Sequence, residues 1–188
     1  METNRIVLTM PRLFIIIIAL LPLISTAIAQ ENQSGQFDFW IDQWHIEQKI
    51  LDKNGDWLEY EARTEVKYIL NKQAIEEHWH GEVRFFWEDM AEPQQLEGYS
   101  LRYYDEDAGK WLIYWMDSLH PAVKEPFAGT FTTASHGEFF RTTYNSEEKT
   151  IARITFDLID EHTVDWKLAI SKDGSTWQTL WTMLMRRK

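Results

Sequence analysis

Residues 59–70 read Glu-Tyr-Glu-Ala-Arg-Thr-Glu-Val-Lys-Tyr-Ile-Leu. Charged residues hold the odd positions from Glu59 to Lys67, and the even positions from Tyr60 to Leu70 carry no formal charge. Successive side chains of an extended strand point to opposite faces, so this spacing is typical of a strand and not of a helix. The stretch predicts a β-strand with one charged face and one uncharged face.

Similar alternation recurs along the rest of the chain. From Phe37 onward no segment keeps a helical apolar period for three turns, and turn-forming residues separate the alternating runs. Asn54-Gly55 and Asp173-Gly174 are hairpin dipeptides, because glycine supplies a positive φ at little cost. The sequence thus predicts an antiparallel meander of about ten strands. The further runs cover residues 42–51, 74–87, 96–105, 110–118, 126–134, 138–145, 150–158, 163–171 and 176–186, with longer loops at 107–109, 135–137 and 145–148.

A meander of this length usually curls and closes, because closure removes its exposed edges. We therefore expect an all-β, up-and-down antiparallel barrel formed by one domain over residues 37–188. A barrel of eight to ten strands has room for side chains or for one small ligand. The alternative is an open sandwich of two sheets.

The N-terminus has the features of an export signal. Arg5 and Arg12 precede an apolar run, residues 13–24, and Ala27-Ile28-Ala29 follows it. The run is shorter than the roughly 20 residues of a membrane-spanning helix. The pattern predicts a signal peptide over residues 1–29 and a periplasmic or secreted protein without a stable membrane anchor, whose polar residues 30–36 form a flexible lead.

Composition excludes several classes of function. The chain contains no cysteine, which rules out disulfides, thiolate metal sites, cysteine nucleophiles and a lipid on an N-terminal cysteine. Its 30 acidic and 19 basic residues give a net charge of −11. Such a surface repels nucleic acid, so we expect no nucleic-acid partner.

The start of the predicted domain resembles a known protein family. Residues 37–44 read Phe-Asp-Phe-Trp-Ile-Asp-Gln-Trp, similar to the Phe-Asp-Phe-Trp-x-Gly-x-Trp opening of a group of bacterial exported proteins of unknown function. The resemblance continues through residues 75–77, 98–105, 110–111, 115–117 and 171–177, although Asp42 replaces the family's glycine. It implies a calycin-like barrel, related to lipocalins and fatty-acid-binding proteins, in which Trp40 and Trp44 close one end. It implies no activity, since one fold hosts many functions.

Strand parity indicates which side chains enter the lumen. Trp79, Trp111, Trp115, Trp166 and Trp181 share the apolar parity of their strands, where they either fill the lumen or line it. Glu77 has the parity of Trp79, and Asp117 has that of Trp115. A buried carboxylate is costly unless it is paired, so these acids predict an inward arginine, either Arg102 or Arg153. The direction of Arg102 is left open by its neighbours.

Metal and cofactor sites are not expected. Glu76, His78 and His80 share one strand face, as a metal site would require, but Ile75 and Trp79 hold the opposite parity, which places the triplet on the solvent side. His162, the last histidine, falls in a turn, where a haem ligand is not expected.

These observations favour a binding protein for a small, partly apolar or amphipathic molecule. The expected ligand-binding residues combine aromatic walls with polar anchors. An enzyme, a hydrolase or isomerase that uses the inward carboxylates, and a solid-cored scaffold for protein partners are the alternatives. The candidate set comprises Trp44, Glu77, Trp79, Arg102, Tyr104, Trp115, Asp117, Arg153 and Trp166.

We predict cleavage of the signal peptide between Ala29 and Gln30, because small residues occupy both recognised positions before that bond. N-terminal sequencing of the protein from an extracytoplasmic fraction should begin at Gln30. An intact Met1 on a membrane-embedded product would contradict the prediction.

Overall fold

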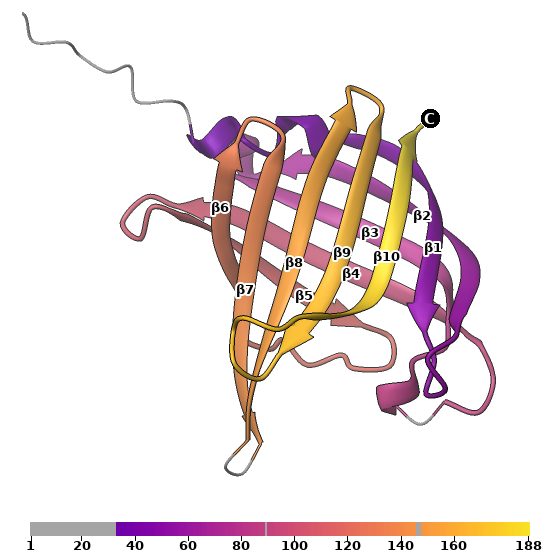
Figure 1. Cartoon of the computed structure of the whole chain (residues 1–188). Coiled ribbons are helices and arrows are strands. Elements are labelled where there is room, and N and C mark those ends of the chain that lie inside the picture. The colour runs from indigo at the N-terminus through magenta and orange to yellow at the C-terminus, as the bar shows by residue number, and fades with distance from the viewer. Residues whose placement is uncertain (1–32, 89, 146–147) are drawn as a thin grey trace, which may run out of the picture. The chain divides into compact units, whose positions relative to one another are not determined.

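Strands make up most of the computed structural model, which describes residues 33–88, 90–145 and 148–188 (Figure 1). The predicted signal peptide lies outside these residues. Within them, ten strands follow one another in the predicted order; two single-turn 3-10 helices precede the first strand, and two more lie in connections between strands. The strands are β1 (Asp42–Leu51), β2 (Trp57–Ile69), β3 (Ala74–Val83), β4 (Gln94–Asp105), β5 (Lys110–Asp117), β6 (Phe127–Thr133), β7 (His136–Asn145), β8 (Glu148–Asp160), β9 (Thr163–Ser171) and β10 (Gln178–Arg187); the 3-10 helices are η1 (Gln33–Gly35), η2 (Asp38–Trp40), η3 (Leu70–Lys72) and η4 (Phe86–Glu88).

The sheet closes on itself. Each strand pairs antiparallel with the next one in the chain, and β1 also pairs with β10, where Trp44 lies opposite Arg187 and Ile50 opposite Trp181. Every strand therefore has two hydrogen-bonded neighbours, and the unpaired edges of an open sheet are absent. The predicted up-and-down barrel is confirmed, and the alternative of an open sandwich is wrong.

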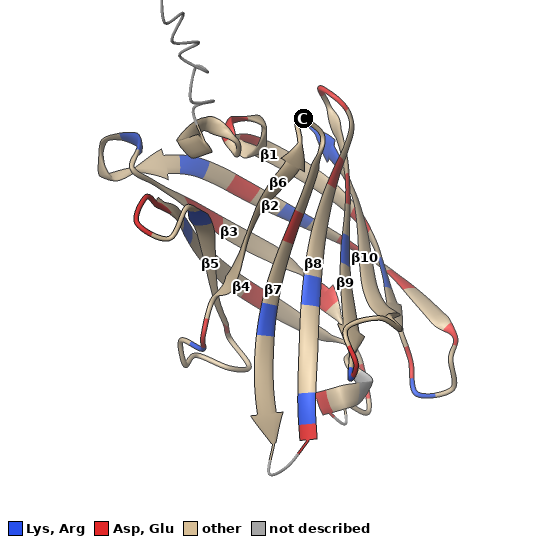
Figure 2. Cartoon of the chain, turned by 60° about the vertical axis from the view of Figure 1, so that its left-hand side comes forward, with Lys and Arg blue, Asp and Glu red and all other residues tan. Residues whose placement is uncertain are grey.

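Charged residues recur along the strands of the barrel (Figure 2), and those in the middle of β2 lie on its outer surface. Along β2, Glu61, Arg63 and Glu65 are exposed, whereas Ala62 and Thr64 between them are buried. This is the alternation from which the strand was predicted. No helix among the described residues combines the length and apolar character needed to cross a membrane.

Tight turns form where the two hairpin dipeptides predict them. Gly55 has a φ of 89° and Gly174 a φ of 77°, in the left-handed region that favours glycine. Beside Gly174, Asp173 Oδ1 accepts hydrogen bonds from the backbone N–H groups of Thr176 and Ser175, both at 2.8 Å. These bonds stabilise the carboxylate and lower the pKa of Asp173.

An aromatic plug, consisting of Phe37, Trp40 and Trp44, closes one end of the barrel. Phe37 precedes β1 and is fully buried. Its ring lies 4.9 Å from that of Trp111 and 5.2 Å from that of Phe156, both nearly perpendicular to it. The plug therefore joins the N-terminal segment to β5 and β8.

Trp40 and Trp44 complete the plug. Their rings stack at 5.4 Å, and Trp44 Nε1 donates a hydrogen bond to the Trp40 carbonyl oxygen at 2.9 Å. Trp40 is 2% and Trp44 1% exposed. The predicted closing role of these two tryptophans is confirmed.

The third predicted strand ends earlier than expected. β3 stops at Val83, and the chain then leaves the sheet. The Phe85 ring stacks on Trp87 at 4.6 Å and meets the Trp181 ring at 5.1 Å. Contacts between aromatic rings at the end of the barrel thus replace the backbone pairing of β3 over residues 84–87. The alternation of the sequence does not indicate where this pairing ends.

The loop predicted at residues 135–137 is shorter than expected, because β7 already begins at His136. Gly137 belongs to the strand, where a Cβ would come within 2.9 Å of the Phe131 ring. This glycine makes room for an aromatic ring instead of forming the turn.

We expect Phe37→Ala to lower the free energy of unfolding by about 3–5 kcal/mol, because it leaves a cavity at the centre of the plug. Phe140→Ala is the matched control, since Phe140 is 37% exposed and its loss opens no buried space. Urea unfolding of both variants measures the difference. Equal, small losses would show that the plug does not stabilise the barrel.

Candidate functional site

The barrel lumen contains a cavity of about 210 Å³. Trp40 of the aromatic plug lines its inner end. Its mouth is formed by residues of the β3–β4 and β5–β6 connections, namely Phe85, Trp87, Glu88, His120, Ala122 and Lys124. β5 and β6 pair only through Trp111, Leu112 and Ile113, so the wall between them is short on the mouth side. The lumen is therefore not filled by side chains.

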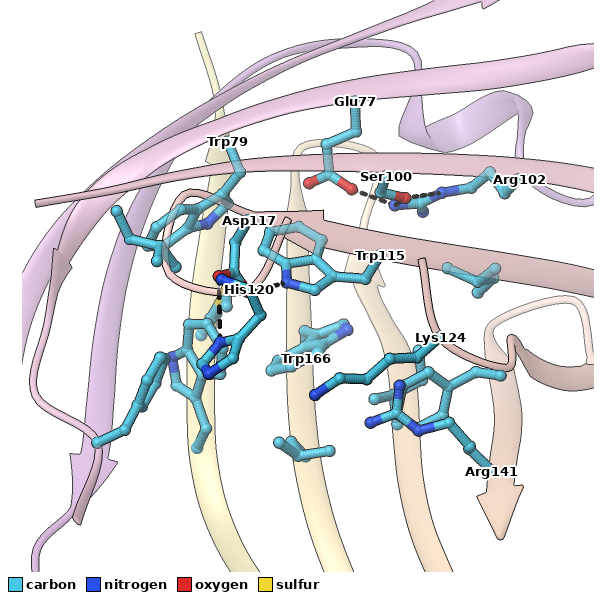
Figure 3. Close-up of a pocket in the computed structure, with 18 of the residues that line it drawn as sticks. Glu77, Trp79, Ser100, Arg102, Trp115, Asp117, His120, Lys124, Arg141 and Trp166 are labelled. Carbon is cyan, nitrogen blue, oxygen red and sulfur yellow. Dashed lines mark hydrogen bonds and ion pairs between the residues drawn. The ribbon is translucent and has the colours of Figure 1, made fainter. Parts of the chain in front are cut away.

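Aromatic rings form much of the cavity wall (Figure 3). The Trp181 ring meets Trp166 at 5.4 Å and Trp79 at 5.9 Å, both close to perpendicular. Trp115 lies across Gly98 of the neighbouring strand, where a Cβ would come within 2.0 Å of the indole. Glycine at this position thus allows an indole to lie against the sheet and face the cavity.

A buried ion pair borders the inner part of the cavity (Figure 3). Arg102 Nη2 donates to Glu77 Oε2, and it also donates to Ser100 Oγ at 3.1 Å. Glu77 Oε1 accepts a hydrogen bond from Thr64 Oγ1 at 3.0 Å. Burial lowers the pKa of Arg102, and the Glu77 carboxylate offsets part of that effect.

Arg102 also contacts the aromatic plug. Its guanidinium carbon lies 5.0 Å from the ring centre of Phe37 and 5.2 Å from that of Trp40. A cation over an aromatic face is attracted by the ring quadrupole. The arginine therefore connects the β3–β4 pair to the closed end of the barrel.

Some buried N–H groups at the cavity have no hydrogen-bond acceptor. Within the part of the chain that the structure describes, Trp40 Nε1, Trp79 Nε1, Arg102 Nη1 and Arg141 Nε are unpaired, and all four residues line the cavity. Buried polar groups of native proteins are almost always satisfied. Four residues of the cavity lining thus carry a buried N–H group without an acceptor in the fold.

Acidic groups on one side of the mouth are held by hydrogen bonds. Asp117 accepts from Trp115 Nε1 at 2.8 Å and from the backbone N–H groups of Leu119 and His120 at 3.0 and 2.7 Å. His120 Nε2 lies 3.0 Å from Glu88 Oε2 in η4. This arrangement joins the two connections that form the mouth.

Two cationic side chains also line the cavity. Arg141 extends from β7, and Lys124 comes from the β5–β6 connection. The guanidinium of Arg141 lies 4.4 Å from the ring centre of Phe127. Figure 3 shows both side chains in the cavity below Trp166.

Six of the nine predicted site residues line the cavity. Arg102 points inward and pairs with Glu77, which confirms the predicted contact between an inward acid and an arginine. Asp117 also points inward, as its parity predicts. The six residues are Glu77, Trp79, Arg102, Trp115, Asp117 and Trp166.

The other three predicted site residues do not line the cavity. Trp44 is covered by Trp40 within the plug, and Tyr104 lies at the closed end, with its ring 5.9 Å from that of Trp111. Arg153 pairs with Glu138 at 3.2 Å and lies over Trp177. Its neighbour Ile154 faces the cavity, so strand alternation puts Arg153 outside.

Most residues that line the mouth of the cavity were not among the predicted site residues. Arg141 has the parity of buried Phe139 on β7, which is a signal that could have identified it. Glu88, His120 and Lys124 lie in connections without periodicity, where no comparable signal exists.

The triplet of Glu76, His78 and His80 faces outward, as predicted. The side chains of His78 and His80 are 52% and 38% exposed, and Glu76 pairs with Lys67 at 2.9 Å. Among the described residues, no group of three or more potential ligands is arranged to hold a metal ion. That this triplet does not bind metal remains a prediction.

Comparison with known proteins supports the fold. No family profile and no curated protein matches the chain. The crystal structure of Rv2717c from M. tuberculosis is similar with a TM-score of 0.54 and 12% identity, over 82% of this chain and 97% of that one. The S-type phycobiliprotein lyase CPES from Guillardia theta has a TM-score of 0.48 and 13% identity, over 81% and 90%. The closed ten-stranded barrel is calycin-like, whereas the resemblance to exported proteins with a similar opening remains a prediction.

We expect Glu77→Gln to lower the free energy of unfolding by about 3–5 kcal/mol, because it leaves Arg102 buried without a counterion. Glu59→Gln is the control, since it removes a carboxylate from an exposed pair with Lys49 and should change stability little. Thermal and urea unfolding compare the two variants. A similar small loss of unfolding free energy in both variants would mean that the charge of Arg102 is stabilised without Glu77.

Proposed function

We propose that this protein is an exported binding protein that holds one small, partly apolar molecule in its barrel lumen. The observation that carries the proposal is the cavity itself: its walls are largely aromatic, and side chains do not fill it. A plug that only filled space would use apolar side chains, yet Trp40, Trp79 and Arg102 in the lining each carry a buried N–H group without an acceptor, which costs free energy.

The cavity volume limits the size of the molecule. An apolar cavity of about 150 Å³ holds benzene, and sites for drug-sized ligands measure about 300–1,000 Å³. At about 210 Å³ this lumen suits a body of one or two rings. Larger ligands would have to extend through the mouth.

An enzyme that uses Glu77 and Asp117 is less well supported. Glu77 is neutralised by Arg102, and Asp117 already accepts hydrogen bonds from an indole and two backbone N–H groups. A general acid or base needs a free position facing the reacting group. The scaffold alternative requires a filled lumen, which the cavity contradicts.

We expect a neutral two-ring probe, 2-naphthamide, to bind saturably in calorimetric titration. It should also raise the melting temperature, because a ligand that binds only the native state adds about 2.7 kcal/mol at one hundred times its Kd. Trp115→Ala should weaken this binding. Trp57→Ala is the matched control, since Trp57 lies on β2 and is 43% exposed.

The proposal also predicts that protein purified from its native host carries a small molecule in native mass spectrometry. If 2-naphthamide and its charged analogues all fail to bind folded protein, and no molecule is carried, then lumen binding is wrong.

A further inference from the structure

We infer that the ligand is an anion, whose negative group binds between Arg141 and Lys124 at the mouth while its apolar body enters the lumen. The inference rests on the proposed function and specifies the class of ligand. It follows from two cations of the cavity lining that have no acidic partner among the described residues.

Arg141 lacks a counterion. It shares the inward face of β7 with Phe139, its Nε is buried without an acceptor, and no carboxylate among the described residues forms an ion pair with it. Burial lowers the pKa of Arg141, and no acidic neighbour offsets this effect. Its only compensating contact in the described chain is with the Phe127 ring. Arg141 is half-buried, and a partly desolvated guanidinium gains from an anionic partner.

Lys124 adds a second positive charge to the lining of the same cavity. It is exposed to solvent at the mouth and forms no ion pair among residues that the structure describes (Figure 3). An anion that reaches both cations would accept charge-assisted hydrogen bonds from each of them.

The other charged groups at the cavity have partners in the fold. Glu77 pairs with Arg102, and Asp117 and Glu88 both contact His120. Arg141 and Lys124 are therefore the charged groups of the described lining that lack an ion-pair partner, and both are cations. The chain as a whole carries a net charge of −11, which would repel an anion from most of the surface. Positive charge at this one mouth would guide the anion to the lumen.

The test compares 2-naphthoate with 2-naphthamide, which have nearly the same shape and differ in charge. We expect the anion to bind at least about tenfold more tightly at low salt, as a charged hydrogen-bonding partner would. The advantage should shrink as salt screens the mouth. A cationic analogue, 2-naphthylmethylammonium, should bind more weakly than the amide. Calorimetric titration gives all three affinities.

Variants locate the effect. Arg141→Gln and Lys124→Gln should each reduce the preference for naphthoate and leave the affinity for naphthamide nearly unchanged, and Arg141→Lys should retain most of the preference. Lys110→Gln is the matched control, because Lys110 is exposed at the start of β5, at the closed end of the barrel. Circular dichroism and melting temperature verify that each variant is folded.

Two outcomes would overturn the inference while leaving lumen binding intact. The first is that the amide or the cation binds as tightly as naphthoate. The second is that the preference for naphthoate survives in the double variant of Arg141→Gln and Lys124→Gln. Failure of all three probes to bind folded protein would instead contradict the proposed function.

Discussion

The buried pair of Glu77 and Arg102 is the interaction on which this barrel depends. It crosses from β3 to β4, and its arginine also lies against Phe37 and Trp40, so one side chain fixes strand register and holds the plug. Removing two charges from water is expensive. The buried pair makes the strand register specific. A shift of one residue in either strand would turn one of the two charges to the outside and leave its partner buried alone.

The fold could be predicted from sequence because alternation is a local property. The charged and uncharged faces of residues 59–70 are those of β2, and Gly55 and Gly174 lie where turns are needed. The same rule placed Glu77 and Trp115 inward. Arg153 was included as a possible partner for the inward acids against this rule, since its parity is opposite to that of Ile154, and it lies outside the cavity as the rule requires.

The mouth could not be predicted in the same way. Its residues come from connections whose conformation is set by contacts with distant strands, as when Phe85 leaves the ladder to meet Trp181. Sequence therefore indicates the walls and floor of the site much better than its entrance. The charge of the entrance distinguishes one ligand class from another, so information about specificity lies where sequence patterns are weakest.

The pairing of β1 with β10 has a consequence for how the molecule folds. These strands hold nearly opposite ends of the described chain, so their contacts belong to the most non-local in the structure. The chain between them loses conformational entropy before their contacts can stabilise the fold. Barrels dominated by such non-local pairing fold slowly. Until β10 is available, β1 keeps one unpaired edge and Ile50 lacks its partner Trp181. A chain that lacks β10 therefore exposes an unpaired strand edge that can pair with another chain. Synthesis of β10 removes this route to aggregation.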